Sequence, residues 1–251
     1  MKAIIHSSII VAFGVALAQS AVAADDRWEH TVAIYAIAAA IDGDAGVGNV
    51  TAAVDVSFGD ILDNLDGAAM LAYRAERGPW AVYADLNWMN LKADKGGLGP
   101  AGGTRAEAEL DQFVGEVGGG YALNERLDVY GGLRYWDVDA DVTVATGAPP
   151  GITLSGSLSE DWIDPVVGLR YTWPLSEAWH LVAKGDIGGF GVGSDFSWSV
   201  VAAAGWALSE HATLMFGLRY IGVDYENGSG ANRFLMDLTE GGPAAAFAWR
   251  F

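Results

Sequence analysis

The feature that most constrains the fold is a two-residue alternation framed by aromatic rings. In "PWAVYADLNWMNL", one face of an extended strand carries Trp80, Val82, Ala84, Leu86 and Trp88. The eight residues from one tryptophan to the other, at about 3.3 Å each, extend roughly 26 Å, close to the ~25 Å apolar band of a membrane barrel. This segment is therefore predicted to be a strand that crosses a membrane.

The same spacing recurs elsewhere in the chain. Phe113 and Tyr121 are separated by one such interval, and so are Trp198 and Trp206. Aromatic rings are enriched at the two lipid–water interfaces, so these pairs predict an upper and a lower girdle. The predicted girdle residues are Trp80, Trp88, Phe113, Tyr121, Trp198 and Trp206. Strands of a soluble β-sandwich also alternate, but a sandwich has no reason to space rings by a bilayer thickness.

The fold class that follows is all-β, an antiparallel transmembrane β-barrel, because only a closed barrel satisfies every backbone polar group of strands in lipid. Eleven turn-like junctions predict about twelve strands. With twelve strands the tight turns fall on the side where barrels keep long loops. The alternative is ten strands, with 241–243 inside one long last strand and 28–41 apart from the barrel.

The N-terminal segment has the pattern of a secretory signal peptide. Lys2 precedes an apolar core, and Ala21-Val22-Ala23 forms an A-x-A cleavage site. A membrane anchor is the alternative, but this apolar core is shorter than a spanning helix requires. We expect residues 1–23 to be cleaved and residues 24–251 to form one barrel domain.

Charge and cysteine content exclude several classes of protein. Cysteine is absent, so neither a disulfide framework nor a thiolate metal site is possible. Without residues 1–23 the chain keeps 13 basic and 32 acidic residues, a formal charge of −19. Nucleic acid is not expected as a partner, because phosphate binding requires clustered lysine and arginine.

Charged residues gather on the faces that the alternation turns away from lipid. A repeated Gly-Leu-Arg-Tyr at 132–135, 168–171 and 217–220 places each leucine outward and each arginine inward. The predicted charge network of the lumen comprises Arg74, Asp85, Glu116, Arg134, Arg170, Lys184, Asp186 and Arg219. Such groups either line a selective pore or form an internal ion-pair network that fills a narrow lumen.

No arrangement of residues predicts catalysis, a cofactor or a metal. The three histidines beyond the signal are His30, His180 and His211. His30 and His211 are expected at the rim, and no serine stands at a spacing that would place its hydroxyl on the inward-facing His180. Acidic clusters at 137–141, 160–164 and 224–227 could bind divalent cations, but they lack EF-hand spacing. We expect the protein not to be an enzyme.

The last segment, "PAAAFAWRF", places Phe247, Trp249 and Phe251 on one side of a strand. Together with the signal peptide and the alternating strands, it resembles Gram-negative outer-membrane β-barrel proteins. Segments such as "GDIGGFGVGSDFSW" also resemble a group of uncharacterised proteobacterial outer-membrane barrels. The resemblance implies that the aromatic end is the signal recognised by the barrel-assembly machinery.

The expected location is therefore the outer membrane, with outer-membrane lipid, lipopolysaccharide and the barrel-assembly machinery as partners. The leading functional hypothesis is an integral barrel with a structural or narrow porin-like role. A second is a surface barrel that binds a ligand or lipopolysaccharide through its loops. A lipid-modifying enzyme is the third, and the scarcity of histidine disfavours it. Oligomeric state and any transported solute stay open.

Overall fold

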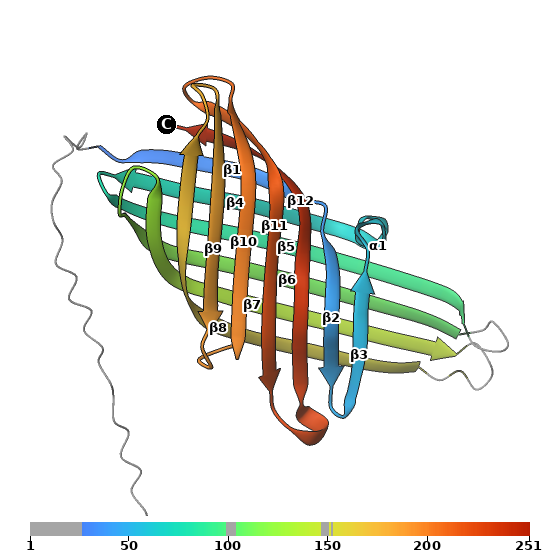
Figure 1. The fold of residues 1–251 in the computed structure, drawn as a ribbon. Helices are drawn as coiled ribbons and strands as arrows, with labels where there is room; N and C mark the ends of the chain where they lie inside the picture. The colour runs from blue at the N-terminus through green and yellow to red at the C-terminus, as the bar shows by residue number, and fades with distance from the viewer. Residues whose placement is uncertain (1–26, 99–103, 147–150, 152) are drawn as a thin grey trace, which may run out of the picture.

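A computed structural model describes residues 27–98, 104–146, 151 and 153–251. The predicted signal peptide lies outside these residues. Twelve antiparallel strands make up one sheet (Figure 1). In chain order they are β1 (Glu29–Ile37), β2 (Ala40–Val47), β3 (Val50–Val56), β4 (Leu65–Arg77), β5 (Trp80–Leu98), β6 (Thr104–Ala122), β7 (Leu127–Thr146), β8 (Thr153–Pro174), β9 (Trp179–Gly189), β10 (Phe196–Ala207), β11 (Ala212–Asn227) and β12 (Phe234–Arg250).

The sheet closes into a barrel of ten strands. β1 pairs with β4 on one side and with β12 on the other, with Thr31 opposite Arg250 and Ile37 opposite Ala244. The β2–β3 hairpin lies outside this closed ring and pairs only through β2 with β12. The predicted antiparallel β-barrel is thus confirmed, and its strand number matches the alternative of ten rather than twelve.

β12 changes partner along its length, which explains the miscount. Its first half pairs with β2 up to Gly241, and its second half pairs with β1 from Ala244 onward. Gly241 has a φ of 152° and Gly43 in β2 a φ of 141°, values that favour glycine and bend a strand without ending it. The turns predicted at 42–44 and 241–243 are therefore wrong. The expectation that 28–41 stands apart is also wrong, because β1 belongs to the barrel.

Ten strands give the barrel the usual polarity. Four tight turns, at 78–79, 123–126, 175–178 and 208–211, lie at one end. At this end the backbone N–H of His30 donates to the Phe251 carbonyl oxygen at 3.0 Å. We call it the inner end, because short turns of such barrels face the periplasm. The opposite end, with the longer connections, is the outer end.

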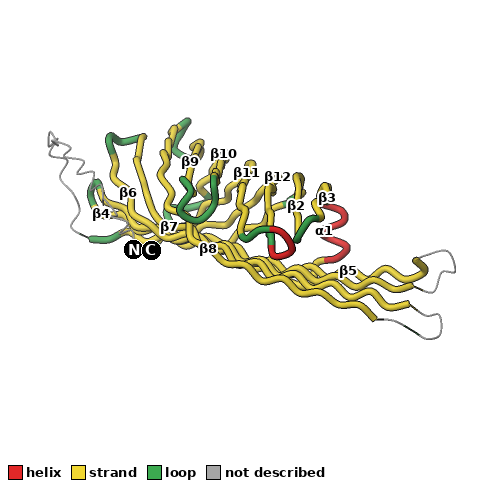
Figure 2. Tube along the Cα trace, turned by 90° about the horizontal axis from the view of Figure 1, so that it is seen from below, coloured by secondary structure: helices red, strands yellow, loops and turns green. Residues whose placement is uncertain are grey.

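Toward the outer end the barrel divides into two walls. β8 pairs with β9 only from Val166 to Pro174, whereas its pairing with β7 continues out to Thr153. We call the outer parts of β5–β8 the tall wall and the outer parts of β10–β12, β2 and β3 the short wall. Figures 1 and 2 show the tall wall projecting well beyond the other strands.

Two short helices lie near this outer end. Helix α1 (Phe58–Asn64) begins with a capping box, in which the Ser57 hydroxyl accepts a hydrogen bond from the Asp60 backbone N–H at 3.2 Å. Its Ile61 is buried against Ile41 and Met89. A 3-10 turn, η1 (Gly230–Asn232), connects β11 to β12. Within the described residues, no helix has the length and hydrophobicity needed to cross a membrane.

Candidate functional site

The centre of the lumen holds a network of four charged side chains. One terminal nitrogen of Arg134 contacts Asp186 at 2.6 Å and Glu116 at 2.5 Å, and the Lys184 amine contacts the other Glu116 oxygen at 3.1 Å. Tyr130 donates a hydrogen bond to Asp186 at 2.8 Å. Side-chain exposure is 1% for Arg134, 0% for Asp186 and 7% for Glu116. All four charges are therefore paired, and three of them are withdrawn from water, whereas Lys184 keeps 23% of its side chain exposed.

A second layer lies around Arg219. Its guanidinium donates to both oxygens of Asp85, at 2.7 and 2.9 Å, in the bidentate geometry that arginine forms with carboxylates. The Tyr35 hydroxyl donates to the same carboxylate at 2.8 Å. Further toward the outer end, Gln112 donates to Glu240 at 2.8 Å.

A third layer lies toward the inner end. Asp128 accepts a contact of 2.7 Å from Arg74 and one of 3.4 Å from Arg170. Arg74 also contacts Glu76, which is half exposed at 48%. All eight residues predicted for the lumen thus occur in these layers, and Arg170 has Asp128 as its partner. Asp128 was not among the eight, although it has the same parity as Arg134.

Tyrosine rings fill the space between these layers. Tyr83 lies over Gly118, where a Cβ atom would stand 2.6 Å from the tyrosine oxygen, and Tyr130 lies over Gly168 in the same way. The Lys184 amine sits 5.0 and 4.8 Å from the two ring centroids. Glycine at the start of two of the three Gly-Leu-Arg-Tyr segments therefore makes room for a tyrosine: Gly168 for Tyr130, and Gly132 for Tyr83, whose oxygen would stand 2.8 Å from a Cβ atom there. The strand alternation did not predict this role, although the inward parity of these glycines was the available signal.

Burial shows how closely the lumen is packed at the level of Arg134. Side chains that line a water-filled channel would be accessible to water, yet Arg134 and Asp186 have almost no accessible surface. A cavity of about 20 Å³ lies nearer the outer end, between Asn87, Arg219 and Glu240. Such a volume holds about one water molecule. At the level of Arg134, the side chains of Arg134 and Asp186 are therefore enclosed by their neighbours.

The residues predicted for the girdle all point outward. Trp80 packs edge-on against Tyr121 with 4.9 Å between ring centroids, and Trp206 stacks on Trp179 at 5.8 Å. These rings lie near the inner end. At the other interface Trp88 is the cross-strand neighbour of Phe113, and Trp198 lies opposite Gly222.

The aromatic residues of the last strand also face outward. Phe247, Trp249 and Phe251 are exposed, whereas Ala244, Ala246 and Ala248 face the lumen. Phe251 stacks on His30 with 5.5 Å between centroids. Of the remaining histidines, His211 contacts the Arg250 carbonyl oxygen and packs beside Trp249 with 5.9 Å between ring centroids, and His180 packs beside Gly205.

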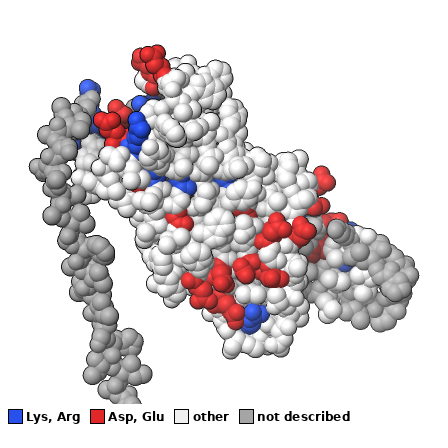
Figure 3. Space-filling model, in the orientation of Figure 1, with Lys and Arg blue, Asp and Glu red and all other residues white. Residues whose placement is uncertain are grey.

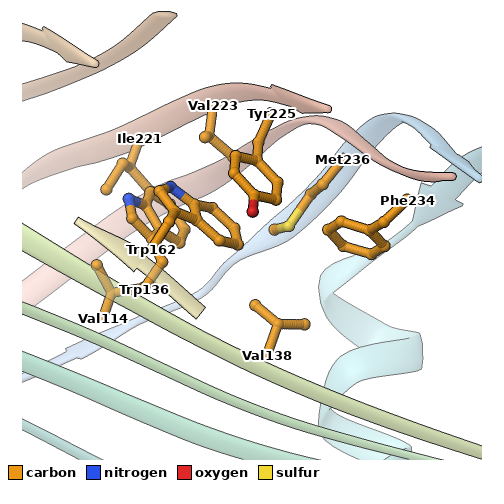
Figure 4. Close-up of a cluster of buried hydrophobic side chains, with 9 residues drawn as sticks. All are labelled: Val114, Trp136, Val138, Trp162, Ile221, Val223, Tyr225, Phe234 and Met236. Carbon is orange, nitrogen blue, oxygen red and sulfur yellow. The ribbon is translucent and has the colours of Figure 1, made fainter. Parts of the chain in front are cut away.

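Above the outer girdle the two walls pack against each other through aromatic side chains. Trp136 and Trp162 of the tall wall stack at 5.6 Å, and Tyr225 of the short wall stacks on Trp162 at 3.9 Å (Figure 4). Phe234 extends the cluster at 5.8 Å from Tyr225. Burial raises the pKa of Tyr225 to about 12. The aromatic cluster therefore closes the space between the walls.

The surfaces of the walls that face away from this cluster are acidic. On the short wall, Asp224 is paired across strands with Asp237, which is paired with Asp44. Figure 3 shows acidic side chains gathered over this region, below a broad band with little charge. In the part of the chain that the structure describes, no three acidic or histidine side chains are arranged to hold a metal ion.

Comparison with known proteins identifies the architecture. The sequence matches no protein-family model, and no curated protein is significantly similar to it. The structure resembles OmpT, an outer membrane protease of Escherichia coli, with 9% identity over 92% of this chain and 99% of OmpT and a TM-score of 0.57. The chain has the fold of Gram-negative outer-membrane β-barrels. At such low identity the similarity to OmpT shows a shared fold and nothing about activity.

Two further similar structures belong to the same class of barrels. One is Ail, the attachment invasion locus protein of Yersinia pestis, with 13% identity over 89% of this chain and 98% of Ail and a TM-score of 0.41. The other is the translocator domain of the autotransporter NalP from Neisseria meningitidis, with 15% identity over 90% of this chain and 89% of that domain and a TM-score of 0.43.

Proposed function

We propose that the protein is an integral outer-membrane barrel with a closed lumen, which holds its two outer walls at the cell surface as a binding platform. The observation that carries the closed lumen is the burial of Arg134 between Glu116 and Asp186. Paired charges in a narrow barrel fill and stiffen it, whereas a pore requires hydrated walls. The structural role expected from the sequence is thereby favoured over the porin-like one.

The binding role rests on the shape and charge of the outer end. Strands β5–β8 continue far past the girdle as a sheet with an apolar face and an acidic face, a length that membrane crossing does not require. In this proposal the barrel is an anchor without catalytic function. Lipopolysaccharide phosphates would meet the acidic face only through bridging divalent cations, because like charges repel.

Residues Phe247, Trp249 and Phe251 have a separate role in the proposal, as the signal for the barrel-assembly machinery. Their outward orientation leaves them available to a partner before the last strand pairs. Trp80, Trp88 and the other girdle residues would fix the depth of the barrel in the bilayer.

Conductance across planar lipid bilayers tests the closed lumen. The purified wild-type protein should not conduct, and neither should Arg105→Ala, a control whose arginine pairs with Asp94 on the outside of the tall wall. Replacing Arg134, Arg170 and Arg219 together by alanine should create a conductance, because it removes three side chains that fill the lumen. Steady conductance by the wild-type protein would refute the closed lumen and restore the porin hypothesis.

A further inference from the structure

The outer part of β8 is an open edge of the tall wall. From Thr153 to Asp164 this strand pairs with β7 on one side, and β9 begins to pair with it only at Val166. No backbone–backbone hydrogen bond from any described segment other than β7 reaches Thr153–Ser159. Further along β8, the Asn227 amide donates to Glu160 and the Ser194 N–H donates to Asp164. Every residue from Thr153 to Ser157 is exposed, and the side chain of Leu154 has 68% of its surface accessible.

From Thr153 to Ser159 this edge lacks the features that natural proteins use to protect an edge. Charged side chains, prolines and bulges normally prevent another strand from pairing there. The sequence "TLSGSLS" from Thr153 to Ser159 contains none of them, and its register with β7 is uninterrupted. At the opposite edge of the tall wall, by contrast, the outer part of β5 carries Lys92 and Asp94.

The direction of the free backbone groups follows from hydrogen bonds further along β8. The N–H of Thr172 donates toward β7, to the Arg126 carbonyl oxygen at 2.8 Å, and the N–H of Leu175 donates toward β9, to Trp179 at 2.9 Å. Because these directions alternate along a strand, the odd-numbered residues of β8 point to the open edge. Ser155, Ser157 and Ser159 therefore present unpaired donors and acceptors.

The side chains around the edge specify the chemistry of an added strand. On one face, Leu154, Leu158 and the half-exposed Val142 of β7 would pack against apolar side chains of the added strand. On the other face the small serines leave the neighbouring β7 acids uncovered: Asp141 is paired with Ser157, and Asp139 with Ser159. Among the described residues, neither aspartate has a cationic partner, so long basic side chains on the added strand could reach both.

We propose that the edge of β8 from Thr153 to Ser159 binds an extended cationic peptide by strand addition, with apolar residues alternating with lysine or arginine. This inference rests on the proposed surface role and names the partner of that platform. Main-chain hydrogen bonds would supply affinity, and the alternation would supply specificity. A second copy of the chain fits less well, because two such edges would bring the same aspartates together.

The test uses the full chain in lipid nanodiscs and a labelled peptide of about eight residues in which lysine and valine alternate. Binding is followed by fluorescence anisotropy. A peptide of the same composition with lysines and valines in separate blocks, and one in which glutamate replaces lysine, are the controls. We expect only the alternating cationic peptide to bind, and its affinity to fall with added salt.

Ser157→Pro removes one free edge donor while leaving the β7 ladder intact, because the Ser157 N–H points away from β7. Pro165, at the same parity, already occupies β8 without shifting this ladder. Binding should be lost in Ser157→Pro and retained in Ser157→Ala. Asp139→Asn with Asp141→Asn should weaken binding by about tenfold. If Ser157→Pro fails to fold, a peptide N-methylated at alternate residues serves instead, because it lacks the backbone N–H groups that the peptide would donate to β8.

The N-methylated peptide is made in two forms, one methylated at its odd residues and one at its even residues. Unchanged binding to Ser157→Pro, or of both N-methylated forms to the wild-type protein, would overturn strand addition. Equal binding of the glutamate peptide would overturn the cationic specificity, and a dimer abolished by Ser157→Pro would identify a second copy as the occupant instead. Failure of peptide binding would leave the bilayer conductance result unaffected. The two proposals can therefore fail separately.

Discussion

Removing the positive charge of Arg134 should destabilise the barrel strongly. In Arg134→Met the apolar stem keeps much of the volume, but Asp186 retains only the Tyr130 hydroxyl and Glu116 only Lys184. Removing one partner of a buried ion pair typically costs 3–5 kcal/mol, so we expect a loss of about 4 kcal/mol in the free energy of unfolding. The matched control is Arg105→Met, whose arginine is 58% exposed, so that its loss should change the free energy of unfolding little.

Urea-induced unfolding in lipid vesicles, followed by tryptophan fluorescence, measures both values. Adding Asp186→Asn to Arg134→Met should recover most of the loss, because Glu116 keeps Lys184 as its partner and no buried carboxylate is then left without a cation. A loss for Arg134→Met as small as that for Arg105→Met would refute the reasoning. It would mean that water reaches the network and that the lumen is hydrated.

Three further changes test other parts of the molecule. Deleting Phe251 should lower the amount of assembled barrel, measured by heat-modifiable migration and membrane yield, and unchanged values would remove its role as an assembly signal. Ala202→Arg should cost about 2–4 kcal/mol in vesicles, because Ala202 faces lipid midway between the girdles, whereas Ala202→Leu should cost little. Trp162→Ala should cost about 3–5 kcal/mol by emptying the centre of the aromatic cluster, and a loss below about 1 kcal/mol would show that the walls do not depend on it. Because the pKa of Tyr225 is raised to about 12 from 10.0, stability should fall between those pH values, and Tyr225→Phe should remove this part of the decrease.

Alternation alone was enough to predict which face each strand turns to lipid. Leu133 and Arg134 are neighbours in sequence, and the strand geometry forces their side chains to opposite faces. The cost of an arginine in lipid then decides which face is inward. The barrel class could be predicted for this reason, without knowledge of any long-range contact.

Partners within the lumen could not be predicted in the same way. Alternation gives the face of a residue but not its height in the barrel, which depends on the register of every intervening strand. Arg134 and Asp186 are 52 positions apart, and the register across β7, β8 and β9 brings them together. Arg170 has the same sequence context as Arg134, yet it lies in a different layer beside Asp128.

The prediction of twelve barrel strands was wrong for a local reason. Gly241-Gly242-Pro243 has the composition of a turn, and only its pairing with β1 and β2 shows that it lies within β12. The position of Trp136 could not be predicted for a related reason. A residue that faces the lumen and a residue that faces the space between the outer walls have the same parity along the strand. The point along a strand at which its inward residues leave the lumen and enter the aromatic cluster depends on where the adjacent strands end.

The pairing of β1 with β12 has a consequence for the rate of folding. Thr31 and Arg250 lie near opposite ends of the described chain, so closing the barrel requires a loop that includes nearly all of it. Loop-closure entropy of this size must be overcome before the contact gives any stability, and such topologies fold slowly. β12 also joins β2 to β11, so a single late event completes both the ring and the short wall. Until β12 has paired, the edges of β1 and β11 are exposed and can pair with strands of other chains. The unfinished barrel therefore depends on a binding partner that covers these edges during that interval.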